Sequence, residues 1–197
     1  MIVKLSPVRS DLTLVVTKSG DTLVINGKAY DLSRLPGGAT LPAEAIGDGF
    51  IIAPVERIDD SLIVTLKLPH GADAPEEARF PVDIVNPADG PVTLPGLEAA
   101  EQQSVAGVID WSQVVTAEMK AEAAGAHLLS AVIADAAQRR ASADAAIAPL
   151  QDAVDLDMAT NEEAALLTGW KRYRVLLSRL PDQEGYPAEI DWPAPPA

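Results

Sequence analysis

The chain has no cysteine, only two histidines and very few aromatic residues, which make up 4% of its 197 positions. The lack of cysteine excludes disulfide bonds, cysteine-ligated zinc and thiol catalysis. His70 lies in a loop with proline and glycine, and His127 lies in an alanine-rich stretch. Neither is placed for a Ser-His-Asp site. We interpret both as ordinary surface or helix-face histidines.

Basic residues are also scarce: 15 Lys and Arg stand against 29 Asp and Glu, for a formal net charge of −14. We expect no nucleic acid and no membrane as partner, because phosphate-rich surfaces need a basic protein surface. No apolar run reaches the roughly 20 residues of a membrane span. The first residues lack the apolar region of a signal peptide. We therefore expect a protein made and kept in a bacterial cytoplasm, unless a partner carries it out.

The first half of the chain has the pattern of a small antiparallel β module. Asn26-Gly27 is the strongest hairpin signal in the sequence, and residues 62–68 alternate between apolar and polar side chains. The predicted strands cover residues 12–17, 22–25, 29–32, 50–52, 55–58, 62–68 and 80–85.

A segment rich in proline and glycine, residues 86–96, separates this module from a region with helical periodicity. From Thr116 the chain has no proline until Pro149, and apolar residues recur at helical spacing. This pattern predicts one long helix, which we expect to fray around residues 139–146. The predicted domains are an antiparallel β domain at 1–95, a linker at 96–115 and a helical domain at 116–197.

A second helix is predicted to begin after Thr160, because Thr160 and Glu163 match a capping box. Pro181 ends it, and the Pro-rich tail from residue 186 is expected to form an extended strap. The apolar seam of this helix has heptad spacing and consists of Leu166, Trp170, Tyr173, Leu177 and Leu180. The predicted fold class is therefore α+β: an N-terminal antiparallel β module, a long helix, and a C-terminal helical domain with an extended Pro-rich tail.

One group of carboxylates invites a functional interpretation. Paired acids can bind calcium or act as acid and base. However, Asp155 and Asp157 come just before a helix start, where negative charge is favourable anyway, and calcium-loop spacing is absent. We predict no metal, no cofactor and no catalytic residue, with a hydrolase acting through Asp155 and Asp157 as the weaker alternative. The group comprises Asp152, Asp155, Asp157, Glu162 and Glu163.

Aromatic and basic residues gather in the run Trp170-Lys171-Arg172-Tyr173-Arg174. Trp170 and Tyr173 are three residues apart and share one helix face, which favours packing on the preceding helix. Trp and Arg are also preferred anchors of protein interfaces. Core packing and partner recognition both stay open for this run.

The C-terminal part of the chain contains an ordered set of short motifs: Pro149-Leu150-Gln151-Asp152-Ala153-Val154-Asp155-Leu156, Ala159-Thr160, Glu163, Trp170-Lys171, Tyr173-Arg174-Val175, Leu177 and Asp191-Trp192-Pro193. Through this set, residues 129–193 resemble the C-terminal domain of the bacteriophage tail fibre assembly protein family. The ordered set at this spacing is more specific than any one of its motifs. The N-terminal β module is only weakly similar to uncharacterised prophage tail-region proteins.

The resemblance implies a non-enzymatic chaperone that binds the C-terminal region of a phage tail fibre polypeptide and promotes its folding and trimerisation. It also implies action in the host cytoplasm, with some family members staying at the fibre tip. The alternative is a permanent structural virion component or a receptor-binding cap at that tip. Whether the protein is a homo-oligomer stays open. The expected fibre-binding residues are Trp170, Lys171, Tyr173, Arg174, Asp191, Trp192 and Pro193, with Thr160 and Glu163 as a structural cap.

Overall fold

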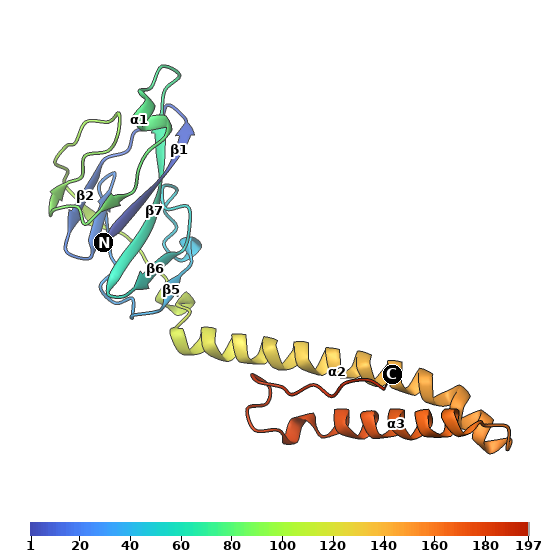
Figure 1. Cartoon of the computed structure of the whole chain (residues 1–197). Helices are drawn as coiled ribbons and strands as arrows, with labels where there is room; N and C mark the ends of the chain where they lie inside the picture. The colour runs from blue at the N-terminus through green and yellow to red at the C-terminus, as the bar shows by residue number, and fades with distance from the viewer. Residues whose placement is uncertain (197) are drawn as a thin grey trace. The chain divides into compact units, whose positions relative to one another are not determined.

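The computed structural model describes residues 1–196 and contains two compact units, the first of Met1–Lys120 and the second from Ala121 onward (Figure 1). The predicted α+β class is confirmed, because the strands lie in the first unit and the two long helices lie almost wholly in the second. The predicted boundaries at 95 and 115 stay a prediction. Within residues 1–196, no helix is both long and apolar enough to cross a membrane.

Two sheets of five strands each make up the first unit. In one sheet the order is β5 (Thr40–Leu41), β6 (Val55–Ile58), β7 (Ser61–His70), β1 (Ile2–Arg9) and β8 (Ile84–Val85). In the other it is β10 (Val105–Ala106), β4 (Lys28–Asp31), β3 (Thr22–Ile25), β2 (Val16–Ser19) and β9 (Gly90–Pro91). Figure 1 shows β1 and β7 side by side.

The local sequence explains the best-defined strands. Leu62, Val64, Leu66 and Leu68 of β7 are each at most 1% exposed, as expected when alternate side chains of a strand face one core. At the β3–β4 turn, Asn26 and Gly27 have φ angles of 47° and 83°, the positive values that a tight hairpin requires. The predicted hairpin and the predicted alternating strand are thus confirmed.

The prediction of a purely antiparallel module is wrong. β1 runs parallel to β7, with Val3 opposite Val64, and β10 runs parallel to β4. The segment that forms β1 was not expected to be a strand. A parallel pair needs a long crossover connection rather than a tight turn, so local hairpin signals cannot reveal it.

Three of the predicted strands are shorter in the structure. The strand expected at 12–17 begins only at Val16, and the one expected at 50–52 is reduced to a single bridge between Ile51 and Leu66. The strand expected at 80–85 is reduced to β8, which follows the short helix α1 (Glu76–Arg79). Pro81 lacks a backbone donor and cannot contribute a ladder hydrogen bond there.

The segment 96–115, predicted as a linker, folds onto the first unit. It contributes β10 and, through Gln102, three hydrogen bonds to β-unit backbone. The Gln102 Nε2 atom donates to the carbonyls of Val15 at 3.2 Å and Val24 at 2.9 Å, and its Oε1 atom accepts from the Gly27 N–H at 2.7 Å. One side-chain amide therefore joins the residue before β2, strand β3 and the hairpin turn.

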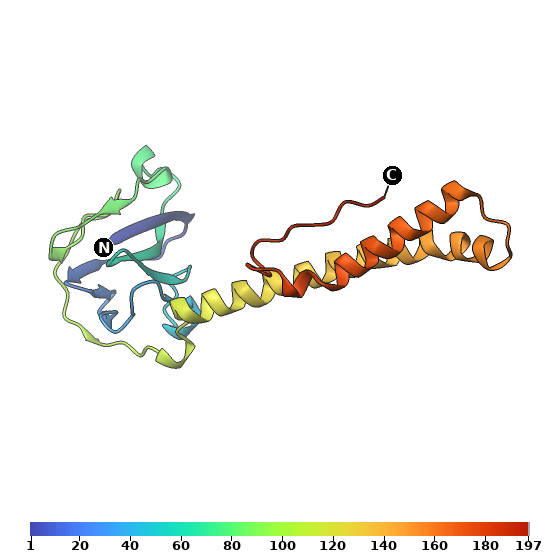
Figure 2. The same cartoon turned by 60° about the horizontal axis from the view of Figure 1, so that its bottom comes forward.

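The second unit is a helical hairpin. Helix α2 (Ala117–Asp155) is followed by α3 (Asn161–Ser178), and α3 doubles back beside α2 in both views (Figure 1 and Figure 2). The expected fraying at 139–146 is wrong, since α2 continues through Pro149. Ala143 is fully buried against Tyr173 and Leu177. Small side chains allow the helices to approach closely, and this packing outweighs the weak local pattern.

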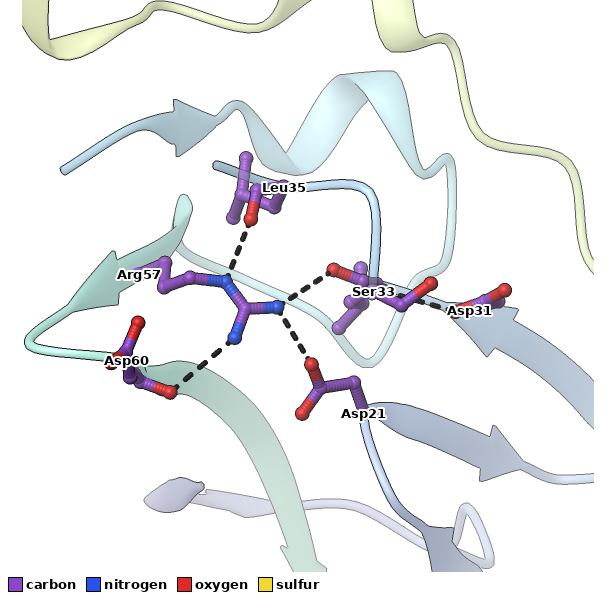
Figure 3. A network of polar contacts seen from close by, with 7 residues as sticks. Asp21, Asp31, Ser33, Leu35, Arg57 and Asp60 are labelled. Carbon is purple, nitrogen blue, oxygen red and sulfur yellow. Dashed lines mark hydrogen bonds and ion pairs between the residues drawn. The ribbon is translucent and has the colours of Figure 1, made fainter. Parts of the chain in front are cut away.

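Arg57 of β6 connects the two sheets of the first unit (Figure 3). Its Nη2 atom donates to Asp21 Oδ2 at 2.8 Å and to the Leu32 carbonyl at 3.2 Å. Its Nε atom donates to the Leu35 carbonyl at 2.7 Å, and its Nη1 atom to the Asp60 carbonyl at 3.3 Å. The side chain is 11% exposed, so its charge is offset mainly by these oxygens.

We expect Arg57→Ala to lower the free energy of unfolding of the first unit by about 2–4 kcal/mol, because it leaves buried oxygens unpaired. Arg9→Ala, at an exposed arginine of β1, should change it by less than about 0.5 kcal/mol. Hydrogen exchange of the β3, β4 and β7 amides as a function of urea measures both. Equal protection in the two variants would contradict the role given to Arg57.

Candidate partner-binding site of the helical hairpin

The core of the hairpin contains part of the predicted site. Tyr173 is 5% exposed and packs with Ala143, Leu177 and Leu180. Trp170 lies partly buried beside it, with ring centroids 5.7 Å apart and the planes at 81°. This edge-to-face geometry is favourable for aromatic pairs. Tyr173 therefore supports the hairpin from inside and offers a partner almost no surface.

The C-terminal segment, residues 183–196, which we call the strap, begins with turns at 184–188 and then runs back along the helices without helix or strand (Figure 1). The extended tail expected from residue 186 is thus present from about residue 190. The Gln183 side chain fixes its bend: Nε2 donates to the Asp191 carbonyl and Oε1 accepts from the Asp191 N–H, both at 2.9 Å. Near the end of the strap, the Pro196 side chain lies 3.3 Å from where a Cβ on Gly169 would be. The absence of a side chain at Gly169 thus lets the strap pass close to α3.

Trp192 attaches the strap to α2. The Arg139 guanidinium lies over its ring at 4.4 Å from the centroid, a cation–π geometry. Arg139 also pairs with Asp135, with Nε and Oδ1 3.1 Å apart. The hydrogen bond with Asp135, followed by one with Tyr173, raises the pKa of Arg139 above its usual value. The cation that holds Trp192 is therefore charged at any physiological pH.

Three of the other predicted partner-binding residues lie at the surface. Lys171 donates to Gln151 Oε1, and Arg174 pairs with Asp144 at 2.7 Å. Asp191 is exposed and Pro193 is partly buried. The predicted set thus divides into residues that pack the hairpin and residues that face solvent. Their contact with a partner stays a prediction.

Thr160 and Glu163 form a reciprocal cap at the start of α3. The Thr160 hydroxyl accepts from the Glu163 N–H at 3.2 Å, and Glu163 Oε2 accepts from the Thr160 N–H at 2.7 Å. The Thr160 backbone bond, with help from its hydroxyl, lowers the pKa of Glu163 below its usual 4.5. The cap is therefore complete at neutral pH and is lost as the pH falls through the lowered pKa.

The carboxylates near this cap do not converge on one point. Asp155 accepts a hydrogen bond from the Gln151 side chain at 2.7 Å. Among residues 1–196, no three His, Cys, Asp or Glu side chains are grouped so as to hold a metal ion. His70 ends β7, and its Nδ1 atom lies 2.9 Å from the Gly71 carbonyl, while His127 is exposed on α2.

A groove between α2 and α3 was missed by the sequence analysis. It has a volume of about 200 Å³, and we call it the α2–α3 groove. A partial signal was present, because small residues at 136 and 137 follow Ile133; only the position of α3 turns that pattern into a concave surface. Its walls are mostly apolar and consist of Ile133, Ala136, Ala137, Arg140, Leu177, Ser178, Leu180, Pro181 and Tyr186.

Comparison with known proteins gives consistent results for this half of the chain. Residues 93–197 match the family described as Caudovirales tail fibre assembly protein, lambda gpK. The chain is 64% identical over 50 residues to a probable tail fiber assembly protein of Acyrthosiphon pisum secondary endosymbiont phage 1. It is 60% identical over 50 residues to the tail fiber assembly protein of Escherichia phage lambda, and 46% identical over 54 residues to tail fiber assembly protein U of Escherichia phage Mu.

These alignments cover 25%, 25% and 27% of this chain and 31%, 25% and 28% of the three relatives, respectively. The chain thus spans about a third or less of the length of the curated relatives it matches. No solved structure matches the chain significantly.

Thr160→Ala is expected to lower the free energy of unfolding of the hairpin by about 1 kcal/mol, through loss of the cap. Thr168→Ala is the matched control, since Thr168 lies exposed inside α3 and its hydroxyl donates to the Ala164 carbonyl of the same helix. That change should be neutral or slightly stabilising, because alanine favours helix. Urea unfolding followed by far-ultraviolet circular dichroism measures both, and equal effects would contradict the capping role.

Trp192→Ala should release the strap and lower the free energy of unfolding of the hairpin by about 1–3 kcal/mol, because both the cation–π contact and the packing are lost. Limited proteolysis should then cut within residues 183–196 much faster than in the unmodified chain. Pro195→Ala, at an exposed strap position, is the control. Unchanged cleavage of the Trp192 variant would show that Arg139 does not hold the strap.

Proposed function

Because the chain belongs to the Caudovirales tail fibre assembly protein family, we propose that it is a non-enzymatic assembly chaperone for a phage tail fibre. It binds the C-terminal region of the fibre polypeptide and promotes its folding and trimerisation in the host cytoplasm. The supporting observation is that the family match, residues 93–197, includes all of the described second unit. The hairpin and its strap are therefore the part that carries this function.

The way in which fibre trimers fold favours the use of an assembly chaperone. Trimers built from long-range β contacts form slowly and expose unpaired strand edges while they fold. A protein that holds one end of the chains lowers the risk of aggregation. The net charge of −14 suits this task, because like-charged complexes repel one another and stay in solution.

We assign two roles within the hairpin. Lys171, Arg174 and Asp191 are exposed and meet the fibre. The second group consists of Trp170, Tyr173, Trp192 and Pro193, which pack the helices and the strap. Loss of a packing residue then weakens assembly indirectly, by loosening the surface that carries the contacts.

Co-expression with the cognate tail fibre polypeptide tests the proposal, with size-exclusion chromatography and light scattering as the readout. Soluble fibre trimer is expected only when this protein is present. If the fibre forms trimers equally well alone and never binds the protein, the chaperone function is wrong. The amount of the protein in purified mature particles then decides between release after assembly and a permanent place at the tip.

Trp170→Ala is expected to reduce the yield of soluble fibre trimer several-fold in the same co-expression, since it removes half of the aromatic pair that orders the hairpin. Arg172→Glu, at an exposed arginine of α3, serves as a surface control. Circular dichroism of each variant separates loss of structure from loss of contact. A normal trimer yield with Trp170→Ala would remove this residue from the functional set.

A further inference from the structure

We propose that the α2–α3 groove is a further fibre-docking surface, in addition to the contacts assigned to Lys171, Arg174 and Asp191, and that it takes a fibre segment presenting an apolar side chain beside an Asp or Glu side chain. This inference rests on the proposed function and names the surface and the chemistry of its partner. It differs from the expectation based on the aromatic run, because Tyr173 is buried and Trp170 and Trp192 are partly buried against the hairpin core, with Arg139 over the Trp192 ring.

The groove accepts an apolar side chain because its walls are apolar and concave. Ile133 and Ala137 form the α2 side, and Leu180, Pro181 and Tyr186 form the opposite side. A volume of about 200 Å³ admits one or two aliphatic or aromatic side chains. Binding energy in interfaces concentrates where such an anchor fills a pocket.

The apolar surface extends beyond the groove along α2. Leu129 is 38% exposed and Ile133 is 54% exposed. These residues are four apart and therefore lie one above the other on the same helix face. A partner that follows this face buries both, so the surface suits a polypeptide segment better than a small molecule.

Arg140 supplies the charge complementarity. It lines the α2–α3 groove together with Ser178, and the same two residues line a neighbouring hollow with Asp144, Arg174 and Val175. Asp144 already pairs with Arg174 at 2.7 Å. Within residues 1–196, Arg140 has no carboxylate in ion-pair range. The neighbouring hollow is therefore lined by two guanidinium groups and one carboxylate. This gives it a local excess of positive charge, although the whole chain has a net charge of −14.

This excess of positive charge favours a fibre segment that carries an acidic side chain. An acidic side chain next to the apolar anchor pairs with Arg140, and pairing across an interface sets its register and excludes wrong partners. A second copy of this chain is the competing occupant. Two copies carry −14 each and repel one another at long range, which favours the fibre.

The test co-expresses the full-length protein with the cognate tail fibre polypeptide and measures the fibre that co-purifies. Arg140→Glu and Ala137→Phe, both at exposed positions, should each reduce it by about tenfold or more, the first by charge repulsion and the second by filling the groove. Arg172→Glu on the solvent side of α3 and Ala134→Phe on the solvent side of α2 are matched controls. They should stay within about twofold of the unmodified protein.

Charge exchange identifies the partner group. Fibre variants with single Asp or Glu residues changed to Lys should include one that restores binding to Arg140→Glu and weakens binding to the unmodified protein. If Arg140→Glu and Ala137→Phe bind fibre like the controls while the unmodified protein binds, the groove is not the docking surface and the proposed function still holds. If the unmodified protein binds no fibre, both are overturned.

Light scattering of the protein alone tests whether a second copy of the chain occupies the groove. A monomer is expected for the unmodified chain. If it forms dimers that Arg140→Glu and Ala137→Phe both dissociate, the groove is occupied by a second copy and the proposal is wrong. Circular dichroism confirms that each variant is folded before binding is compared.

Discussion

The contact between Arg139 and Trp192 is the constraint on which the second unit depends. A guanidinium 4.4 Å from the centre of an indole ring, itself paired with Asp135, ties a strap without regular secondary structure to a helix. The strap has no sheet ladder to hold it, so side chains must supply its attachment. Gln183 fixes its bend and Gly169 makes room for its end. Arginine suits this role because it stacks and donates hydrogen bonds at once.

This attachment determines which surfaces are left for a partner. A chain with 4% aromatic residues places two tryptophans and two tyrosines in or against the hairpin core. Those rings bury apolar area that α2 and α3 alone cannot cover. The side of the hairpin that includes Ile133, Ala137 and Arg140 keeps a concave apolar surface, and Arg140 beside it has no ion-pair partner among residues 1–196. Recognition and packing are therefore divided between two faces of the same helices.

In the first unit, the features predicted correctly from the sequence depend on neighbouring residues, and the features that were missed join segments far apart in the chain. Asn26-Gly27 and the alternating residues of β7 act within a few positions and were predicted. The parallel pairing of β1 with β7 joins segments some 60 residues apart, and no local pattern encodes it. Gln102 and Arg57 behave alike: each reaches several carbonyls from separate elements. From the sequence alone, such a polar residue would be assigned to the surface, because its hydrogen-bond partners come together only in the folded chain.

The sequence by itself determined the α+β class, the two long helices, the capping box at Thr160 and the family to which the chain belongs, because periodicity, caps and motif spacing are properties of neighbouring residues. Only the tertiary structure decided what the aromatic and basic residues contact. Trp170, Tyr173 and Arg174 lie within five consecutive residues, yet they are half-buried, buried and exposed in turn. Their environment depends on where α2 and the strap pass, and that is set by packing between distant segments. The same packing creates the α2–α3 groove, whose residues come from three separate stretches of chain.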